Sequence, residues 1–407
     1  MASFSDKVNF IWSIAELLRG DYKASEYGRV ILPLVVLRRL DSVLEPTKEA
    51  VLAAVQRGTP ELALQHVAKQ SFYNTSALTF RKLLDDPGQA AANLRSYING
   101  FSSTARETFE KFDFDAQISK LEEAGVLFQV LQKFAAIDLH PDTVSNREMG
   151  YVFEELIRRF SEQSNETAGE HFTPREVVRL MVDMLFLEDG ELLSAPGINR
   201  RLLDPACGTG GMLSVAEEYL RDLNPSARLF VYGQEVNDES YAICRSDMMI
   251  KGQSASNIVV GNSFSKDGFP GQTFDYFLCN PPFGVEWKKV EKVVRDEHER
   301  QGTPGRFGAG LPRINDGSLL FLQHMIAKWD PPERVGSRLA IVFNGSPLFT
   351  GDAGSGESNI RQWLIEQDWL EAIERHPSIA PSGRKNTSEP PGTLYLHRRS
   401  CPIRRHN

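Results

Sequence analysis

The chain has 407 residues, of which 41% are hydrophobic and 25% charged, and its formal net charge is −8 at pH 7. This composition is globular and excludes disordered, collagenous and fibrous chains, and the length favours two or three domains. Because nucleic acid attracts basic surfaces, an acidic chain that binds it needs a local basic patch or a partner subunit.

The cysteines and the apolar runs exclude further classes of protein. Four cysteines at wide, unpatterned spacing form neither a disulfide framework nor a CxxC-type zinc site, and we expect no metal. The longest apolar run, Val30–Leu37, is far shorter than the ~20 residues of a membrane span. We therefore expect a cytoplasmic protein that does not engage a membrane.

The first third of the chain repeats apolar residues at helical spacing and shows no strand-like alternation. The expected helical segments are Phe10–Leu18, Glu26–Leu44, Glu61–Gln70, Gln89–Tyr97 and Asp115–Phe134. This pattern predicts an all-helical N-terminal domain over residues 1–145, with a helical cap on the following domain as an equal alternative. His140–Asn146, with its proline and polar turn-formers, is the expected hinge.

From Arg147 the pattern changes to strands interleaved with helices. A helix over Glu148–Phe160 and a polar loop precede a second helix that opens at Thr173. The expected strands that follow are Arg201–Leu203, Leu229–Gln234, Ile258–Val260, Phe274–Cys279, Leu339–Phe343 and Trp369–Ile373. The expected helices between them are Met212–Leu223, Asp238–Lys251, Leu319–Lys328 and Ser358–Gln367. Residues 146–374 are therefore predicted to form an α/β domain with a doubly wound, mostly parallel, Rossmann-like sheet, whose ligands bind at the carboxyl ends of the strands.

The first motif, Asp204-Pro-Ala-Cys-Gly-Thr-Gly-Gly211, lies between an expected strand and an expected helix. Glycines in this place let the backbone approach a nucleotide-like ligand. Leu213 breaks the GxGxxG dinucleotide fingerprint, and no lysine follows the glycines as in a P-loop. Asp-Pro-x-x-Gly-x-Gly instead looks like motif I of S-adenosylmethionine-dependent methyltransferases that methylate amino groups. The alternative is a tight strand-to-helix turn without a ligand.

Polar residues also end the next two expected strands. Glu235 follows the second strand, where an acid hydrogen-bonds ribose hydroxyls in nucleotide-binding sheets. After the third strand, amino-methyltransferases often carry an acid that reads the cofactor's adenine. This chain has Asn262 in that region, and the resemblance makes it a candidate for the same contact.

The motif Asn280-Pro281-Pro282-Phe283 follows an apolar strand and resembles motif IV of enzymes that methylate an exocyclic or amide nitrogen. Such a nitrogen is a poor nucleophile, and it improves when acceptors take its hydrogens as charge develops. The Asn280 side chain and the Pro281 carbonyl can be those acceptors, and the prolines fix the backbone. Phe283 can stack on a base flipped out of the duplex. Cytosine-carbon methylation would instead need a Pro-Cys nucleophile, and Cys279 is expected to pack in the strand.

Together with the N-terminal segments Trp12–Tyr22 and Glu26–Leu40, these motifs resemble the modification (methylase) subunit of type I restriction-modification systems. The resemblance implies N6-adenine methylation of DNA with S-adenosyl-L-methionine as the cofactor. It implies as partners a specificity subunit, a restriction (translocase and nuclease) subunit and a second copy of the chain. The implied cofactor-binding residues are Glu170, His171, Phe172, Thr173, Pro174, Arg175, Asp204, Gly208, Thr209, Gly210, Gly211, Glu235 and Asn262. The implied catalytic residues are Asn280, Pro281, Pro282 and Phe283.

Two segments near the carboxyl end of the chain carry further expectations. The polar stretch Val285–Gly317, with basic residues that include Arg295, Arg306 and Arg313, is a candidate DNA-facing loop. Arg375–Asn407, with five prolines, seven basic residues and one acid, predicts a disordered or frame-shifted tail and a sheet without its last strands. This tail leaves a non-catalytic, truncated assembly subunit as one alternative. A second alternative is a methyltransferase that acts on a protein amide or an RNA nitrogen, because Asn-Pro-Pro followed by an aromatic residue occurs there too.

Overall fold

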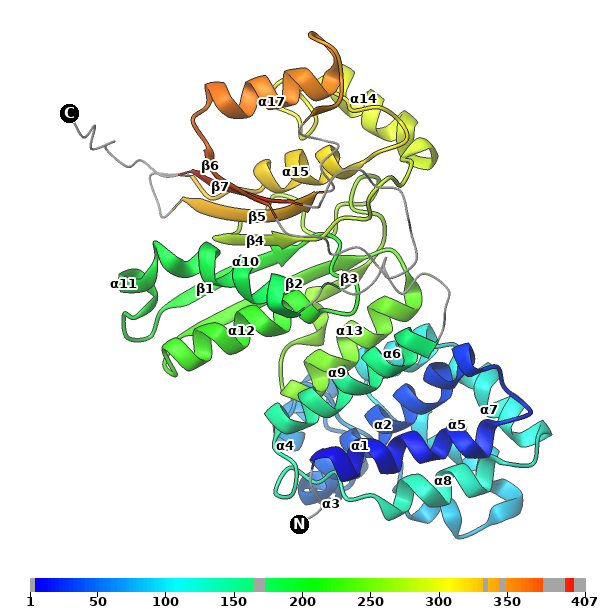
Figure 1. Cartoon of the computed structure of the whole chain (residues 1–407). Helices are drawn as coiled ribbons and strands as arrows, with labels where there is room; N and C mark the ends of the chain where they lie inside the picture. Colours follow the sequence, from blue (N-terminus) through cyan, green and yellow to red (C-terminus); the bar gives the residue numbers. More distant parts are fainter. Residues whose placement is uncertain are drawn as a thin grey trace. The chain divides into compact units, whose positions relative to one another are not determined.

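The computed structural model describes residues 4–163, 173, 175–331, 336–343, 349–375 and 392–398 (Figure 1). The chain divides into two compact units. One consists of Met1–Ala168 with Asp238–Ile258, and the other of Gly169–Asn237 with Val259–Asn407. The helices that follow residues 145 and 237 therefore group with the N-terminal helices, and the chain passes from the α/β unit into the helical unit and back between its second and third strands.

The helical unit is built around one helix whose middle part is apolar on all sides. Its α-helices are α1 (Phe4–Ser13), α2 (Tyr27–Leu44), α3 (Lys48–Gln56), α4 (Glu61–Ala68), α5 (Ala90–Asn99), α6 (Ser103–Lys111), α7 (Phe114–Glu123), α8 (Leu127–Ala136), α9 (Asn146–Gln163) and α13 (Asp238–Lys251). Every residue of Val30–Leu37 in α2 is buried, as expected for a central helix. Gly125, at a φ of 70°, separates α7 from α8, where the sequence predicted one continuous segment.

The segment expected to be a hinge is held firmly by a buried arginine. Arg39 in α2 is fully buried and donates hydrogen bonds to the carbonyls of Leu139 and Val144 and to the Asn146 side chain (2.7 Å). Because a buried cation is costly unless it is hydrogen-bonded, these bonds from Nη1 and Nη2 favour one path for residues 139–146. The segment expected to be a hinge therefore lies within the helical unit and not at the boundary between the two units.

The α/β unit contains a seven-stranded sheet in the order β3-β2-β1-β4-β5-β7-β6. The strands are β1 (Asn199–Asp204), β2 (Arg228–Glu235), β3 (Ile258–Val260), β4 (Tyr276–Cys279), β5 (Ser337–Phe343), β6 (Leu370–Arg375) and β7 (Gly392–Arg398). β1 pairs in parallel with β2 and β4, and β4 pairs in parallel with β5. The six expected strands are all present, and the predicted doubly wound, mostly parallel sheet is confirmed.

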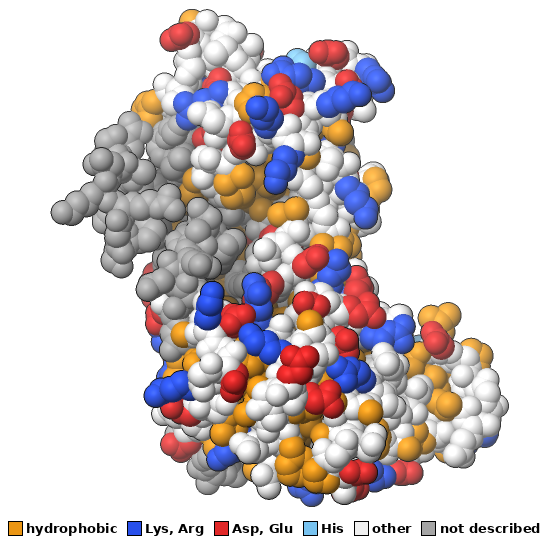
Figure 2. All heavy atoms as spheres, turned by 90° about the vertical axis from the view of Figure 1, so that its right-hand side faces the viewer, with side chains coloured by type: hydrophobic (Ala, Val, Ile, Leu, Met, Phe, Trp, Pro, Cys, Tyr) orange, Lys and Arg blue, Asp and Glu red, His pale blue; other side chains and the backbone are white. Residues whose placement is uncertain are grey.

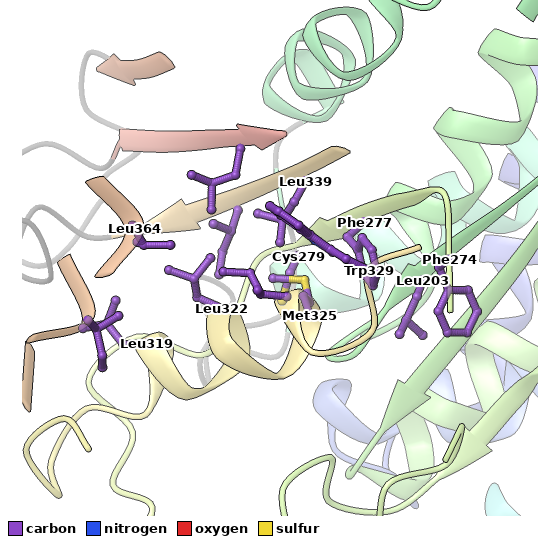
Figure 3. Packing of buried hydrophobic residues seen from close by; sticks show 14 of the residues in the cluster. Leu203, Phe274, Phe277, Cys279, Leu319, Leu322, Met325, Trp329, Leu339 and Leu364 are labelled. Atoms are coloured by element: carbon purple, nitrogen blue, oxygen red, sulfur yellow. The ribbon is translucent and has the colours of Figure 1, made fainter. Parts of the chain in front are cut away.

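Helices cover both faces of this sheet. The α-helices of the unit are α10 (Arg175–Leu187), α11 (Gly190–Leu193), α12 (Gly211–Leu223), α14 (Glu291–Gln301), α15 (Ser318–Ile326) and α17 (Gly356–Glu366). Successive residues of a strand point to opposite faces. Accordingly, Tyr276 contacts Phe186 of α10 edge to face, with ring centroids 4.8 Å apart. Phe277 joins the core on the other side, where Leu322 and Met325 of α15 pack with the strands (Figure 3).

The tail contains a strand that the sequence did not predict. Gly392–Arg398 form β7, which inserts between β5 and β6 and pairs antiparallel with both. Leu396 is fully buried in the core shared with α15 and α17. The prediction of disorder is wrong for these residues, because prolines and basic residues elsewhere in the tail hid the strand-forming run Thr393–Leu396. The described sheet therefore has one strand, β7, beyond the six that were expected.

Within the described residues, no helix combines the length and the apolar character that crossing a bilayer requires.

The burial of Leu396 makes β7 a testable part of the fold. We expect Leu396→Ala to lower the free energy of unfolding by about 2–5 kcal/mol, because it opens a cavity in the core between sheet and helices. Leu62, which is 81% exposed in α4, provides the control, since its replacement by alanine changes stability by less than about 0.5 kcal/mol. Urea unfolding measures both, and equal stabilities of the two variants would contradict the placement of β7.

Candidate active site

The glycine motif forms a tight turn between β1 and α12. Gly208 and Gly210 have φ values of 53° and 88°, in the left-handed region where a side chain is strained. The Gly210 N–H donates to the Cys207 carbonyl (2.8 Å), and the Cys207 N–H donates to the Gln234 carbonyl (3.1 Å) in β2. Gly211 begins α12, and a Cβ at this residue would meet open space. The turn therefore leaves the start of α12 accessible.

Glu235 at the end of β2 is locked to the glycine turn by backbone hydrogen bonds. Its Oε2 accepts a bond from the Gly208 N–H (2.9 Å), and its Oε1 accepts bonds from the N–H groups of Val236 (2.8 Å) and Asn237 (2.7 Å). These donors hold the carboxylate at the carboxyl edge of the sheet. The structure therefore brings together two parts of the site, Gly208 and Glu235, which the sequence predicted separately.

Asp204 ends β1 and is almost completely buried. Its Oδ1 accepts a bond from the Ala206 N–H (3.0 Å). Burial raises the pKa of Asp204 to about 8, the Ala206 N–H opposes this shift, and the Glu235 carboxylate adds to it. Asp204 is consequently mostly protonated at neutral pH, which avoids a buried negative charge beside the half-buried Glu235.

The loop after β3 is tied to both preceding turns. Asn262 Oδ1 accepts from the Phe264 N–H (3.0 Å) and organises the loop, while the Ser263 hydroxyl donates to the Pro205 carbonyl (2.6 Å). The Gly261 N–H donates to the Glu235 carbonyl (2.8 Å). The ends of β1, β2 and β3 thus form one hydrogen-bonded edge, and Asn262 lies on it.

Asn280 follows β4 and presents an acceptor with no partner. Its Nδ2 donates to Thr173 Oγ1 (2.8 Å), whereas its Oδ1 is buried and has no hydrogen-bond partner among the described residues. Leaving a buried acceptor unpaired costs about 1–3 kcal/mol, and such groups are rare. Pro281 is buried, whereas Phe283 is 38% exposed. A rigid acceptor with an exposed aromatic ring nearby suits a planar group that carries N–H donors.

Cys279 has no part in this chemistry. Its side chain is fully buried in the core between the sheet and α15, which confirms the predicted packing role. Burial raises the pKa of the Cys279 thiol well above its usual range, and the Asp204 and Glu235 carboxylates add to the shift. A thiol in this environment stays protonated and is a poor nucleophile.

The remaining candidates lie near α10 or outside the described residues. Glu170, His171, Phe172 and Pro174 lie outside them. Arg175 begins α10 and contacts Glu218 of α12 (3.1 Å). The side chains of Thr209 and Pro282 are half-buried and exposed, respectively.

Sequence reasoning overlooked Gln234 in β2. Its buried side chain donates to the carbonyls of Gly261 (3.1 Å) and Lys266 (2.7 Å) and accepts from the Gly268 N–H (3.0 Å). These bonds hold the loop after β3 in place. The sequence did offer a sign of this role, because Gln234 carries an amide at the end of an expected strand, directly before the candidate ribose ligand Glu235.

The parallel sheet and its order are those expected for the fold of S-adenosylmethionine-dependent methyltransferases. Residues 144–379 match the family model described as N-6 DNA Methylase, and residues 7–134 match that of the HsdM N-terminal domain. The chain belongs to the N-6 DNA methylase family.

Among similar proteins is the type I restriction enzyme MjaIX methylase subunit of Methanocaldococcus jannaschii, 25% identical over 91% of this chain and 66% of the relative. The HindI methylase subunit of Haemophilus influenzae is 27% identical over 61% of this chain and 51% of the relative. These matches confirm the resemblance to type I methylase subunits. The chain spans less than two thirds of the length of these relatives.

Solved structures share the fold. A type I restriction-modification methyltransferase subunit from Streptococcus thermophilus superposes with a TM-score of 0.74 at 23% identity, over 97% of this chain and 85% of that chain. A chain from a study of complex assembly and conformational transition in the type I system superposes with a TM-score of 0.64 at 23% identity, over 96% of this chain and 74% of that chain.

The raised pKa of Asp204 predicts a distinctive dependence of stability on pH. Its folded pKa of about 8 lies above the ordinary 3.8, so the unfolded chain loses this proton first as pH rises. The contribution of Asp204 to stability therefore falls between about pH 4 and pH 8. We expect Asp204→Asn, which cannot ionise, to gain stability relative to the wild type across this window and to level off above it.

Urea unfolding at pH 5, 7 and 9 measures this difference. Asp352→Asn, at an exposed position of the same unit, is the control and should show no such trend. A stability difference between Asp204→Asn and the wild type that does not change with pH would refute the buried, protonated state of Asp204.

Proposed function

We propose that this chain transfers a methyl group from S-adenosyl-L-methionine to the N6 amino group of adenine in DNA. The observation that carries the proposal is the unpaired, buried Oδ1 of Asn280, held at the end of β4 by the bond from Nδ2 to Thr173. An acceptor fixed in this way matches the amino N–H of a flipped base. The family to which the chain belongs supports the same chemistry.

The residues at the carboxyl ends of β1, β2 and β3 fit the cofactor. Gly208, Gly210 and Gly211 place no side chain at the start of α12, so that a ligand can approach the backbone. The Glu235 carboxylate is positioned to accept ribose hydroxyls, and Asn262 lies beside it on the same edge. We assign Asp204 and the segment from Glu170 to Arg175 to the same site. When bound, the cofactor supplies an electrophilic methyl group on a positively charged sulfur.

The protein's contribution to the reaction is to orient and polarise the amino group. Asn280 Oδ1 and the Pro281 carbonyl accept its two hydrogens, which favours a pyramidal nitrogen whose lone pair is free to attack. As the nitrogen gains positive charge, these two oxygens stabilise it more strongly, so the bonds lower the barrier rather than only binding the base. Phe283 stacks on the base and, with Pro282, limits its movement.

The surface charge supports a division of labour between subunits. The face shown in Figure 2 carries Lys and Arg side chains interleaved with Asp and Glu, and the whole chain has a net charge of −8. DNA affinity depends on neutralising phosphates with clustered basic residues. We therefore assign sequence recognition and most of the affinity for DNA to a specificity subunit, and DNA cleavage to a restriction subunit. The complex would also contain a second copy of this chain.

The structure weakens the reason to consider a non-catalytic assembly protein. That alternative depended on a sheet lacking its last strands, and β7 together with β6 occupies this side of β5. Methylation of a protein amide or an RNA nitrogen uses similar acceptors, but the match of residues 144–379 to the N-6 DNA Methylase model favours the DNA substrate.

The test is transfer of a labelled methyl group to DNA, with the full chain assayed alone and together with a specificity subunit. We expect Asn280→Ala to lower kcat by about 100-fold or more, because it removes an acceptor that acts mainly in the transition state. The affinity for S-adenosyl-L-methionine, measured by calorimetry, should stay close to that of the wild type.

Asn199→Ala serves as the matched control, since Asn199 is exposed and lies at the opposite end of β1. It should retain full activity. Absence of adenine-linked label with every protein combination would discard the proposal, as would an Asn280→Ala variant as active as the wild type.

A further inference from the structure

Arg306 belongs to the stretch expected to face DNA, but its side chain turns inward. It is 18% exposed, and its guanidinium lies over the Phe307 ring, 4.8 Å from the centroid. An arginine that binds phosphates presents its charge to solvent, so the burial of Arg306 indicates another role.

All five N–H donors of the Arg306 guanidinium have acceptors. Nε donates to Glu297 Oε1 (2.9 Å), and Nη2 donates to Glu297 Oε2 (2.6 Å) and to the Phe264 carbonyl (2.8 Å). Nη1 lies 2.9 Å from the Ser263 carbonyl and 3.0 Å from His324 Nδ1. Five donors in a planar fork are special to arginine, and lysine offers three on a single atom.

His324 fits this arrangement as a neutral acceptor. The ring is almost fully buried in α15, and burial, with the charges of Arg306 and Lys328, lowers the pKa of His324 to about 3. A neutral ring can accept the Nη1 hydrogen at Nδ1. Arg306 thereby connects three separate elements: α14 through Glu297, α15 through His324, and the loop after β3.

The two carbonyls that Arg306 holds belong to the turns of the candidate cofactor site. Ser263 and Phe264 directly follow Asn262, whose Oδ1 accepts from the Phe264 N–H (3.0 Å). The Ser263 hydroxyl continues the connection by donating to the Pro205 carbonyl (2.6 Å) of the glycine turn. A continuous path of hydrogen bonds thus runs from the segment after the catalytic motif to the turns after β3 and β1.

We propose that Arg306 is a positioning residue that fixes the cofactor-side turns from the segment following the catalytic motif. It acts through the Ser263 and Phe264 carbonyls and, by way of the Ser263 hydroxyl, on Pro205. The proposal rests on the proposed use of S-adenosyl-L-methionine at these turns. Without the planar guanidinium of Arg306, the Ser263 and Phe264 carbonyls lose their donors, and the loop that carries Asn262 becomes more mobile.

The first measurement is backbone hydrogen exchange of the full chain without ligand, comparing the wild type with Arg306→Lys. We expect faster exchange in residues 261–268, with unchanged exchange in α12 as an internal reference for a folded unit. Arg300→Lys is the control, because Arg300 lies in α14 and is 79% exposed. Exchange in residues 261–268 that is identical in all three proteins would overturn the proposal.

The second measurement is calorimetry with S-adenosyl-L-methionine at a temperature where every variant is folded. We expect Arg306→Lys to weaken binding about 10-fold, the effect of losing two hydrogen bonds to the loop, and Arg300→Lys to have no effect. Ser263→Ala should also weaken binding. Arg306 and Ser263 act through one path of hydrogen bonds. The loss of affinity in the double variant should therefore be smaller than the product of the losses in the two single variants.

The results separate the two proposals. The positioning role would be overturned if Arg306→Lys bound S-adenosyl-L-methionine as tightly as the wild type, even with a lower melting temperature. It would also be overturned if the loss of affinity in the double variant equalled the product of the two single losses. A wild type that binds no S-adenosyl-L-methionine would instead contradict the proposed function, while the exchange experiment would still decide whether Arg306 holds the loop.

Discussion

The chemistry assigned to this protein depends on one hydrogen bond, from Asn280 Nδ2 to Thr173 Oγ1. An amide can present either its oxygen or its NH₂ group to a ligand, and the two choices have opposite polarity. With Nδ2 engaged by a hydroxyl, the oxygen remains a buried acceptor that has no hydrogen-bond partner among the described residues. The burial of that unpaired oxygen destabilises the folded protein. A substrate that donates a hydrogen bond to it removes this cost, so the same free energy favours binding and catalysis.

The edge of the sheet behind Asn280 is held mainly by backbone groups and short polar side chains. Gly208 donates to Glu235, Ser263 donates to Pro205, and Gly261 donates to the Glu235 carbonyl. Such bonds leave little conformational freedom in the three turns. A methyl transfer that is accelerated mainly by positioning the reactants needs turns that are ordered in this way before the ligands bind. The raised pKa of Asp204 has a related effect at this edge, because a protonated Asp204 places no second negative charge beside the Glu235 carboxylate.

Local patterns predicted the strands that end at the candidate site residues, whereas long-range contacts did not follow from them. The strands around Asp204, Glu235 and Asn280 could be located because apolar runs end at polar turn residues, and parallel strands bring those ends together. β7 escaped because its seven residues lie in a segment rich in proline and basic residues, and its pairing partners lie far away in the chain. Arg306 was counted as a surface base, since nothing in its neighbourhood in the sequence reveals acceptors on the loop after β3.

The measurement that tests this account most directly is the single-turnover rate of methyl transfer to DNA by Thr173→Val and Thr173→Ser, at saturating S-adenosyl-L-methionine. Valine has the shape of threonine but accepts no hydrogen bond, so the amide of Asn280 is free to turn its NH₂ group toward the base. The account predicts a rate lowered by about 5- to 10-fold, the effect of one hydrogen bond, with serine restoring most of it. A Thr173→Val variant that transfers the methyl group as fast as the wild type would contradict the central role of this bond.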